Sequence, residues 1–182
     1  MLIKNTRFWP GLGILALAIA LGCSNDEVII DGGEELQPSV SSVSFSECLG
    51  QSVALAGLVP PDRSCIEYEY DAGSAVLKVR HANAGFNCCP ENISATVDVS
   101  DGVITVTETE TFGEHGGCSC LCLYNLDFEI KDLESGQYRV VIVELYLDGD
   151  DEPLDFVVDL GEIQVDTVCV DRDHYPWGVN PN

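Results

Sequence analysis

Residues 93–111 read ISATVDVSDGVITVTETET, and this stretch decides the fold class. Apolar and polar side chains alternate on both sides of Asp101-Gly102, over Ile93–Val99 and again over Val103–Thr111. A period of two is typical of a β-strand with one buried face. Asp-Gly between two such runs indicates a tight primed turn, because both residue types accept a positive φ. The stretch therefore predicts a β-hairpin.

The alternation extends from residue 40 through most of the remaining chain, and turn residues interrupt it at short intervals. Beyond residue 24 no long 3.6-residue period is present, and β-branched residues fill most apolar positions. Further strands are predicted at Ser52–Ala56, Cys65–Tyr70, Ala75–Ala82, Cys120–Ile130, Gln137–Leu147, Leu154–Leu160 and Glu162–Val170. Many short strands in one domain predict an all-β fold, and we favour an antiparallel β-sandwich over a barrel.

Cysteine is unusually frequent, with nine in the chain. Eight of them follow Cys23: Cys48, Cys65, Cys88, Cys89, Cys118, Cys120, Cys122 and Cys169. In an exported protein an even set of this density predicts four disulfides. Spacing alone leaves about 105 possible pairings of eight cysteines.

Three of these cysteines are spaced two residues apart, namely Cys118, Cys120 and Cys122. On an extended strand their side chains would share one face. Successive sulfurs on such a strand lie at the edge of disulfide reach, so we expect each to bond to another element. The vicinal Cys88-Cys89 pair is also expected to bond outward, with one or both cysteines paired to this ladder. The rest of the pairing would then be shared by Cys48, Cys65 and Cys169.

A metal site is the alternative for this ladder. Cys118, Cys120 and Cys122, together with Cys88, Cys89 and His115, offer soft ligands for Zn²⁺ or Cu⁺. Structural zinc sites usually aim paired sulfurs at one point from a tight turn, whereas a straight strand separates them. The spacing therefore favours disulfides over a metal.

A weak surface site for Ca²⁺ is a second metal hypothesis. The candidate ligands are Asp148, Asp150, Asp151 and Glu152. Pro153 stands where a calcium-binding loop of this spacing requires glycine, and the apolar alternation resumes directly after it. The segment is therefore better explained as a turn, and we expect no resident cofactor.

Two short segments carry resemblances. Residues 133–140, LESGQYRV, resemble the loop-to-strand entry of immunoglobulin-like and transthyretin-like sandwich domains, in which an aromatic residue after a glycine enters the core. Residues 87–90, NCCP, combined with 118–122, CSCLC, and Tyr124 resemble small uncharacterised cysteine-rich secreted proteins of Bacteroidota. The first resemblance implies an architecture, and the second implies no activity.

The N-terminal segment resembles a bacterial lipoprotein signal. Residues 8–23, FWPGLGILALAIALGC, follow Lys4 and Arg7 and form an apolar run too short for a comfortable membrane span. The resemblance implies cleavage before Cys23 and lipid attachment to that cysteine, as with palmitate. Residues 1–22 would be the signal peptide, residues 23–39 an acidic stalk and residues 40–182 one domain. The SNDE start of the stalk resembles a surface-export signal, which implies an outer-membrane lipoprotein exposed at the cell surface.

The mature chain would be strongly acidic. Without Lys4 and Arg7 it would keep 6 basic against 31 acidic residues, a net charge of −25. Such a charge argues against binding of nucleic acid or anionic lipid, which requires clustered Lys and Arg. We therefore expect contact with the membrane only through the lipid anchor.

No catalytic signature stands out. Paired carboxylates are too abundant to nominate an acid and base, and His81, His115 and His174 are scattered along the sequence and expected at the surface. The sequence favours a non-enzymatic binding or structural module of the cell envelope, with a protein or a glycan as ligand. The alternatives are a metal-binding lipoprotein and a carbohydrate-active accessory protein or hydrolase.

Overall fold

The domain is built from β-strands. The computed structural model describes residues 37–49 and 59–173, which belong to one compact unit spanning residues 35–182. Within these ranges there is no helix with the length and apolarity needed to cross a membrane. The strands are β1 (Ser39–Val40), β2 (Ser44–Phe45), β3 (Arg63–Asp71), β4 (Val76–Asn87), β5 (Asn92–Ser100), β6 (Val103–Thr111), β7 (Leu121–Lys131), β8 (Gln137–Val143), β9 (Asp155–Asp159) and β10 (Val165–Asp171). The predicted all-β class is confirmed, while the predicted strand at 52–56 lies outside the described residues.

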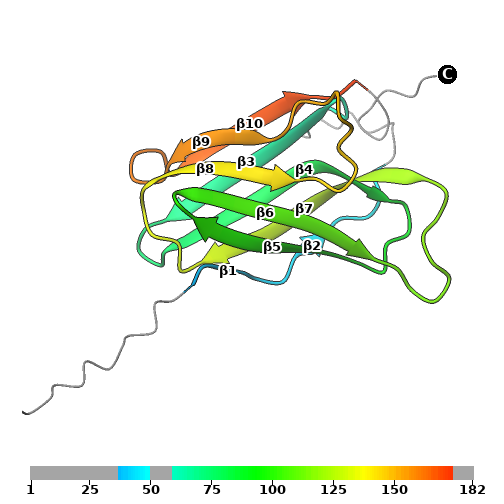
Figure 1. The fold of residues 1–182 in the computed structure, drawn as a ribbon, viewed down its shortest axis with the longest axis horizontal. Coiled ribbons are helices and arrows are strands. Elements are labelled where there is room, and N and C mark those ends of the chain that lie inside the picture. Colours follow the sequence, from blue (N-terminus) through cyan, green and yellow to red (C-terminus); the bar gives the residue numbers. More distant parts are fainter. Residues whose placement is uncertain (1–36, 50–58, 174–182) are drawn as a thin grey trace, which may run out of the picture. The chain divides into compact units, whose positions relative to one another are not determined.

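The strands form two sheets (Figure 1). Sheet A has six strands in the order β1-β7-β4-β3-β10, with β2 also paired to β7, and sheet B has four in the order β5-β6-β8-β9. Neighbouring strands are antiparallel except β6 and β8, which run parallel. Between them the chain forms β7 in the other sheet, and such a crossover is what parallel strands require. The prediction of purely antiparallel pairing is wrong at this one place.

The two sheets share one hydrophobic core. Alternation on β6 turns Ile104 and Val106 inward, where both are almost completely buried, and leaves Thr105 and Thr107 on the outer face. The core cluster takes side chains from both sheets: Ile66, Tyr68, Leu77, Val79, Phe86, Ile93, Ile104, Val106, Leu126, Phe128, Ile130, Val140, Ile142 and Val158. The gap left between these layers has a volume of only about 10 Å³. The inside of the domain is therefore filled by side chains, as expected for close-packed protein interiors.

The Asp-Gly hairpin forms as the sequence predicts. Ser100 is paired with Val103, which leaves a two-residue turn between β5 and β6. Asp101 and Gly102 have φ values of 51° and 75°, and two positive φ angles in succession are the requirement of a type I′ hairpin turn. The predicted bounds of β6 are also those observed.

A β-bulge makes β4 longer than predicted. The register with β7 shifts between His81 and Ala84, and Asn83 has a φ of 62°. The extra residue moves the inward positions from odd numbers to even ones, so Leu77 and Phe86 both face the core. Because the shift breaks the period of two, the sequence prediction ended this strand at residue 82. The side-chain amide of Asn83 donates to the carbonyls of Pro60 and Arg63, each at 2.8 Å, which holds the bulge in place.

Other strand ends also differ from the prediction. β8 ends at Val143 instead of residue 147, because Glu144 turns into a buried ion pair described below and the chain leaves the sheet there. β10 begins at Val165, three residues after the predicted start. β1 and β2, of two residues each, are too short to show a period in the sequence.

Candidate functional site

All eight cysteines of the domain are paired. The four disulfides are Cys48–Cys122, Cys65–Cys169, Cys88–Cys120 and Cys89–Cys118. The cysteine count predicts this number, and the vicinal pair bonds outward to two members of the ladder as expected. Four disulfides indicate an oxidising, extracytoplasmic environment for the folded chain.

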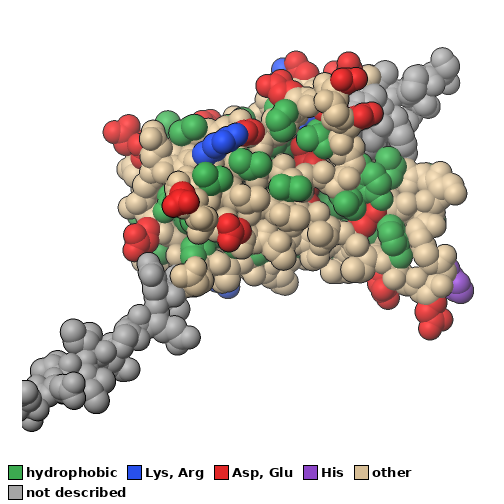
Figure 2. Space-filling model, viewed as in Figure 1, with side chains coloured by type: hydrophobic (Ala, Val, Ile, Leu, Met, Phe, Trp, Pro, Cys, Tyr) green, Lys and Arg blue, Asp and Glu red, His purple; other side chains and the backbone are tan. Residues whose placement is uncertain are grey.

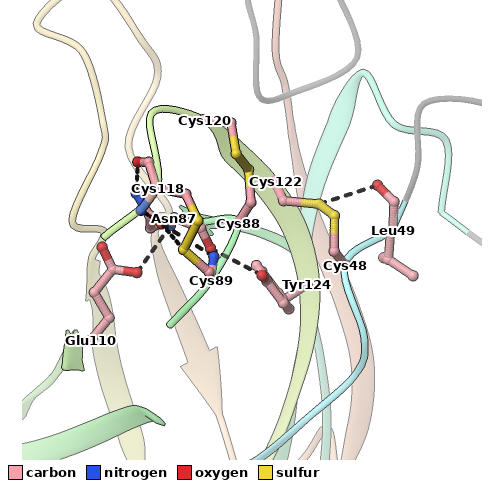
Figure 3. Close-up of a disulfide and its surroundings, with 10 residues drawn as sticks. All are labelled: Cys48, Leu49, Asn87, Cys88, Cys89, Glu110, Cys118, Cys120, Cys122 and Tyr124. Atoms are coloured by element: carbon pink, nitrogen blue, oxygen red, sulfur yellow. Dashed lines mark hydrogen bonds between the residues drawn. A yellow bond between two sulfur atoms is a disulfide. The ribbon is translucent and has the colours of Figure 1, made fainter. Parts of the chain in front are cut away.

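The cysteine ladder is not on one strand. β7 begins at Leu121, so only Cys122 lies in it, while Cys118 and Cys120 belong to the segment that leads into the strand. The prediction of three sulfurs on one strand face is therefore wrong. The related prediction, that the three would bond to other elements and not to one another, is confirmed. Figure 3 shows the three resulting bridges next to one another.

Asn87 organises this group of bridges (Figure 3). Its Oδ1 accepts from the backbone N–H groups of Cys89 at 3.1 Å and Cys118 at 2.9 Å, and its Nδ2 donates to the Cys118 carbonyl at 2.7 Å. The hydroxyl of Tyr124 donates to the Asn87 carbonyl at 3.0 Å. The residues 87–90 and the segment 118–124, noted together in the sequence, are therefore in direct contact. Sequence reasoning identified the cysteines but not the role of Asn87.

These sulfurs are not free thiolates. Each of them is committed to a disulfide, so the ladder and the vicinal pair offer no thiolate ligand to Zn²⁺ or Cu⁺ in this state, and His115 lies exposed in the loop before Cys118. Over residues 37–49 and 59–173, no three or more His, Cys, Asp or Glu side chains are grouped so that they could hold a metal ion.

The acidic segment that suggested calcium forms a turn. The backbone N–H of Asp148 donates to Oδ2 of Asp151 at 3.0 Å, and the N–H of Asp151 donates back to the Asp148 carbonyl at 3.1 Å. The N–H of Gly149 donates to Oδ1 of Asp148. The carboxylates of Asp148 and Asp151 are thus used to close the turn, whereas Asp150 and Glu152 make no contribution to it. A weak calcium site here stays a prediction.

A network of polar side chains lies inside the domain. The Nδ1 atom of His81 is 2.7 Å from Oε1 of Glu108, and its Nε2 atom is 2.8 Å from Oγ of Ser64. Glu144 Oε1 is 3.9 Å from the same Nε2, and both Glu144 oxygens accept from Nη2 of Arg172, at 2.9 and 2.7 Å. These five residues, here called the His81 network, are each at most 8 % exposed. They join β3, β4 and β6 to the segments that follow β8 and β10.

The expectation that His81 is a surface residue is wrong. It occupies an inward position of β4 and is completely buried, whereas His115 is exposed as expected and His174 lies outside the described residues. One signal in the sequence could have revealed the network. Glu108 continues the inward series Ile104, Val106 of β6, and a charged residue at a core position requires a partner.

Burial and neighbouring charges both shift the pKa values of His81 and Glu144 in the network. Burial alone would lower the pKa of His81, but the neighbouring carboxylates of Glu108 and Glu144 outweigh it and the pKa rises above 6.5. Burial also raises the pKa of Glu144, against the opposing effects of His81 and Arg172. With His81 protonated, two positive and two negative groups balance inside the core. A buried network of this kind depends on all of its members being paired.

Part of the network has the connectivity of a hydrolytic triad. The order hydroxyl, Nε2, Nδ1, carboxylate through Ser64, His81 and Glu108 is the order in which serine hydrolases activate their nucleophile. Ser64, however, is 0 % exposed and faces the core. A nucleophile must reach a substrate atom, and this hydroxyl has no access to one. The three side chains therefore act in this structure as a structural hydrogen-bonded unit.

An accessible site lies on the outer face of sheet A. A groove of about 600 Å³ crosses the sheet from the β1–β2 segment to β10. Eleven of its fifteen lining residues are hydroxyl-bearing or charged Ser, Thr, Asp, Glu, Lys or Arg, and the full set is Ser41, Ser42, Ser44, Glu67, Tyr68, Glu69, Lys78, Val79, Arg80, Asp127, Phe128, Glu129, Val165, Asp166 and Thr167. The sequence did not single out these residues, because outward positions of a strand carry no pattern beyond polarity. We take this groove as the candidate functional site.

The outer face of sheet B has a different chemistry. Its outward positions carry the row Thr105, Thr107 and Thr109 on β6 and the exposed apolar residues Val143 and Val157. Figure 2 shows uncharged side chains over the middle of this face and most of the charged ones toward its rim. The two faces therefore differ: sheet A carries aligned rows of opposite charge, whereas sheet B carries the pair Arg139 and Asp155 among uncharged side chains.

The comparisons with known proteins returned no family. No protein-family model, no curated protein and no solved structure matches the chain.

Proposed function

We propose that the chain is a lipid-anchored cell-envelope protein that acts as a non-enzymatic binding module, with the groove on sheet A as its binding surface. The observation that carries this proposal is the contrast between two sites. The polar groove is open and is lined from five strands, whereas the only described Ser-His-acid arrangement is sealed in the core. Ligand sites are concave and hold a few convergent polar groups, which describes the groove.

The proposed location in the cell envelope is supported by the disulfides and by the resemblance of the N-terminal segment to a lipoprotein signal. Residues 1–36 lie outside the described part of the chain, so the signal peptide, lipidated Cys23 and stalk stay predictions. Lipidation at this cysteine would tether the module to the outer membrane, at the cell surface. Labelling of cells with a palmitate analogue should mark the wild-type protein and not a Cys23→Ala variant. An unlabelled wild-type protein, or an intact leader in its mass spectrum, would refute the anchor.

We further propose that the two sheets form an immunoglobulin-like or transthyretin-like sandwich. Contacts made by residues 133–140 support this proposal. Leu133 is 1 % exposed, its carbonyl accepts from the Tyr70 hydroxyl at 2.8 Å, and Tyr138 packs against the core. These contacts support the architecture.

The binding proposal has a direct test. Immobilised wild-type protein is incubated with a panel of neutral polysaccharides, a deca-lysine peptide and polyglutamate, and compared with a Lys78→Ala/Arg80→Ala variant. Arg139→Ala is the matched control, because Arg139 is a similarly exposed arginine, paired with Asp155 on the outer face of sheet B. The proposal predicts binding that the groove variant loses and the control keeps. Binding that both variants retain would place the site elsewhere.

A further inference from the structure

The floor of the groove is built from three columns of charge. Because β4 lies between β3 and β7 in sheet A, Lys78 is aligned with Glu69 on one side and Glu129 on the other. Two residues further along β4, Arg80 is aligned in the same way with Glu67 and Asp127. A column of donors therefore runs between two columns of acceptors, about 5 Å away on each side.

Hydroxyl groups line the two walls. Ser41, Ser42 and Ser44 belong to the β1–β2 segment at one edge, and Thr167 lies on β10 at the other. Across the groove at Arg80 the order is thus hydroxyl, carboxylate, cation, carboxylate, hydroxyl. Beside Lys78 the position on β10 is occupied by Val165, which is aligned with Glu69. Each polar type stands beside a different one, so a ligand group placed between two columns can accept from one and donate to the other.

The floor side chains are only loosely paired with each other. Lys78 lies 3.9 Å from Glu69, and Arg80 lies 3.9 Å from Asp127. These distances exceed hydrogen-bond length, and all four side chains are at least 42 % exposed. Exposed pairs of this kind contribute little to stability. Their donors and acceptors can therefore turn to a ligand at small cost to the fold.

The charge pattern favours an uncharged ligand. A polycation along the floor would meet Lys78 and Arg80, and a polyanion would meet the carboxylate columns. Tyr68, Val79 and Phe128 are at most 6 % exposed and belong to the core, so the floor offers no apolar anchor pockets. The one exposed apolar side chain of the lining is Val165 on β10, at 69 %. Peptide ligands usually depend on such pockets. A chain of hydroxyl groups carries no charge to be repelled and needs no apolar pocket, because each hydroxyl can both donate and accept a hydrogen bond.

We infer that the groove binds an uncharged polyhydroxylated chain, that is, a neutral oligosaccharide or polysaccharide. This inference rests on the proposed binding function and names its ligand class. Each sugar hydroxyl would accept from Lys78 or Arg80 and donate to a neighbouring carboxylate or to a wall hydroxyl. Recognition by hydrogen bonds to a neutral partner should depend little on ionic strength.

The experiment measures binding of a dextran, a xylan, a mannan and a β-glucan by isothermal titration, with deca-lysine and polyglutamate as charged probes. The expected result is saturable binding of at least one neutral polysaccharide that changes less than about twofold between about 50 and about 500 mM salt. Lys78→Ala/Arg80→Ala and the carboxamide variant Glu67→Gln/Glu69→Gln should each weaken it about tenfold or more, or about 1.4 kcal/mol. Arg139→Ala should leave it unchanged.

The possible failures are distinct. Groove-dependent binding of deca-lysine or polyglutamate, with affinity that falls steeply as salt rises, would keep the binding module and overturn the neutral ligand. Binding that all three variants retain, or no binding of any probe in the panel, would count against both the groove and the inference. Thermal melting of each variant, which should match the wild type, verifies that a loss of binding is not a loss of fold.

Discussion

His81 Nδ1 and Glu108 Oε1 lie 2.7 Å apart in the core, joining the central strand β4 of sheet A to β6 of sheet B. The contact connects the two layers through polar side chains, and both side chains are at most 2 % exposed. It therefore couples the packing of the sheets to the protonation of one imidazole.

Replacement of His81 by Ala should destabilise the protein strongly. The change leaves the Glu108 carboxylate buried without its partner, which typically costs about 3–5 kcal/mol. Urea unfolding followed by circular dichroism measures the free energy of unfolding. The double variant His81→Leu/Glu108→Leu should recover much of the loss, because it removes the buried charge and refills the space. Equal losses in both variants would contradict the pairing.

Stability should fall as pH rises above 6.5. The pKa of His81 is raised above 6.5 in the folded state, so the folded chain binds a proton more tightly than the unfolded chain does. Its contribution is complete below 6.5 and disappears as pH rises through the folded pKa. Glu144, whose pKa is raised above 4.5 by burial, acts in the same direction at lower pH. Unfolding free energies measured from pH 6 upward should show the decline, and His81→Leu/Glu108→Leu should show less of it.

Ser64 should not react with a fluorophosphonate probe in the folded protein. Its hydroxyl is 0 % exposed and bonded to His81, so the probe cannot approach it. Intact-mass spectrometry after incubation measures the adduct, and an authentic serine hydrolase serves as positive control. Stoichiometric modification that is absent in Ser64→Ala would show an accessible nucleophile and favour the hydrolase alternative.

The nested bridges Cys88–Cys120 and Cys89–Cys118 should be partly redundant. They close loops with separations of 32 and 29 residues, so once one bridge exists the other restricts the unfolded chain very little more. Removal of either bridge by a double alanine substitution should therefore cost less than about 2 kcal/mol. Removal of both should cost more than the sum, because the last constraint on the loop is lost. Additive losses in denaturant unfolding would contradict this redundancy.

Asn87 should matter for stability as much as a core residue does. Asn87→Ala removes three hydrogen bonds to the backbone of Cys89 and Cys118, with an expected loss of about 2–3 kcal/mol. Asn92→Ala, at an exposed position of β5, is the matched control and should change stability by less than about 0.5 kcal/mol. Disulfide mapping by mass spectrometry verifies that both variants retain the native pairing.

The strands could be predicted where alternation is uninterrupted. The hairpin around Asp101-Gly102 was predicted together with its turn, because both strands keep the period of two and the turn residues accept a positive φ. The bulge at Asn83 could not be predicted, because one inserted residue reverses the alternation of inward and outward side chains on which the strand prediction depends. The partners of β8 also depend on contacts between residues far apart in the sequence, which no local period records.

The candidate site was less predictable than the fold. The cysteine motifs indicated contacts that the structure contains, because covalent chemistry restricts their partners. Lys78 and Arg80 carried no signal of a groove, since their alignment with acids on β3 and β7 exists only in the assembled sheet. His81 was misplaced because its carboxylate partners lie 27 and 63 residues away in sequence.

The parallel pairing of β6 with β8 sets an order of assembly. A nascent chain that has emerged as far as β7 can close the β5–β6 hairpin, yet sheet B gains its remaining half only when the last third of the polypeptide arrives. Arg172, near the very end, then supplies the cation that completes the buried network. Incompletely emerged chains would thus hold an unpaired β6 edge, and they are the species most exposed to aggregation and to proteolysis.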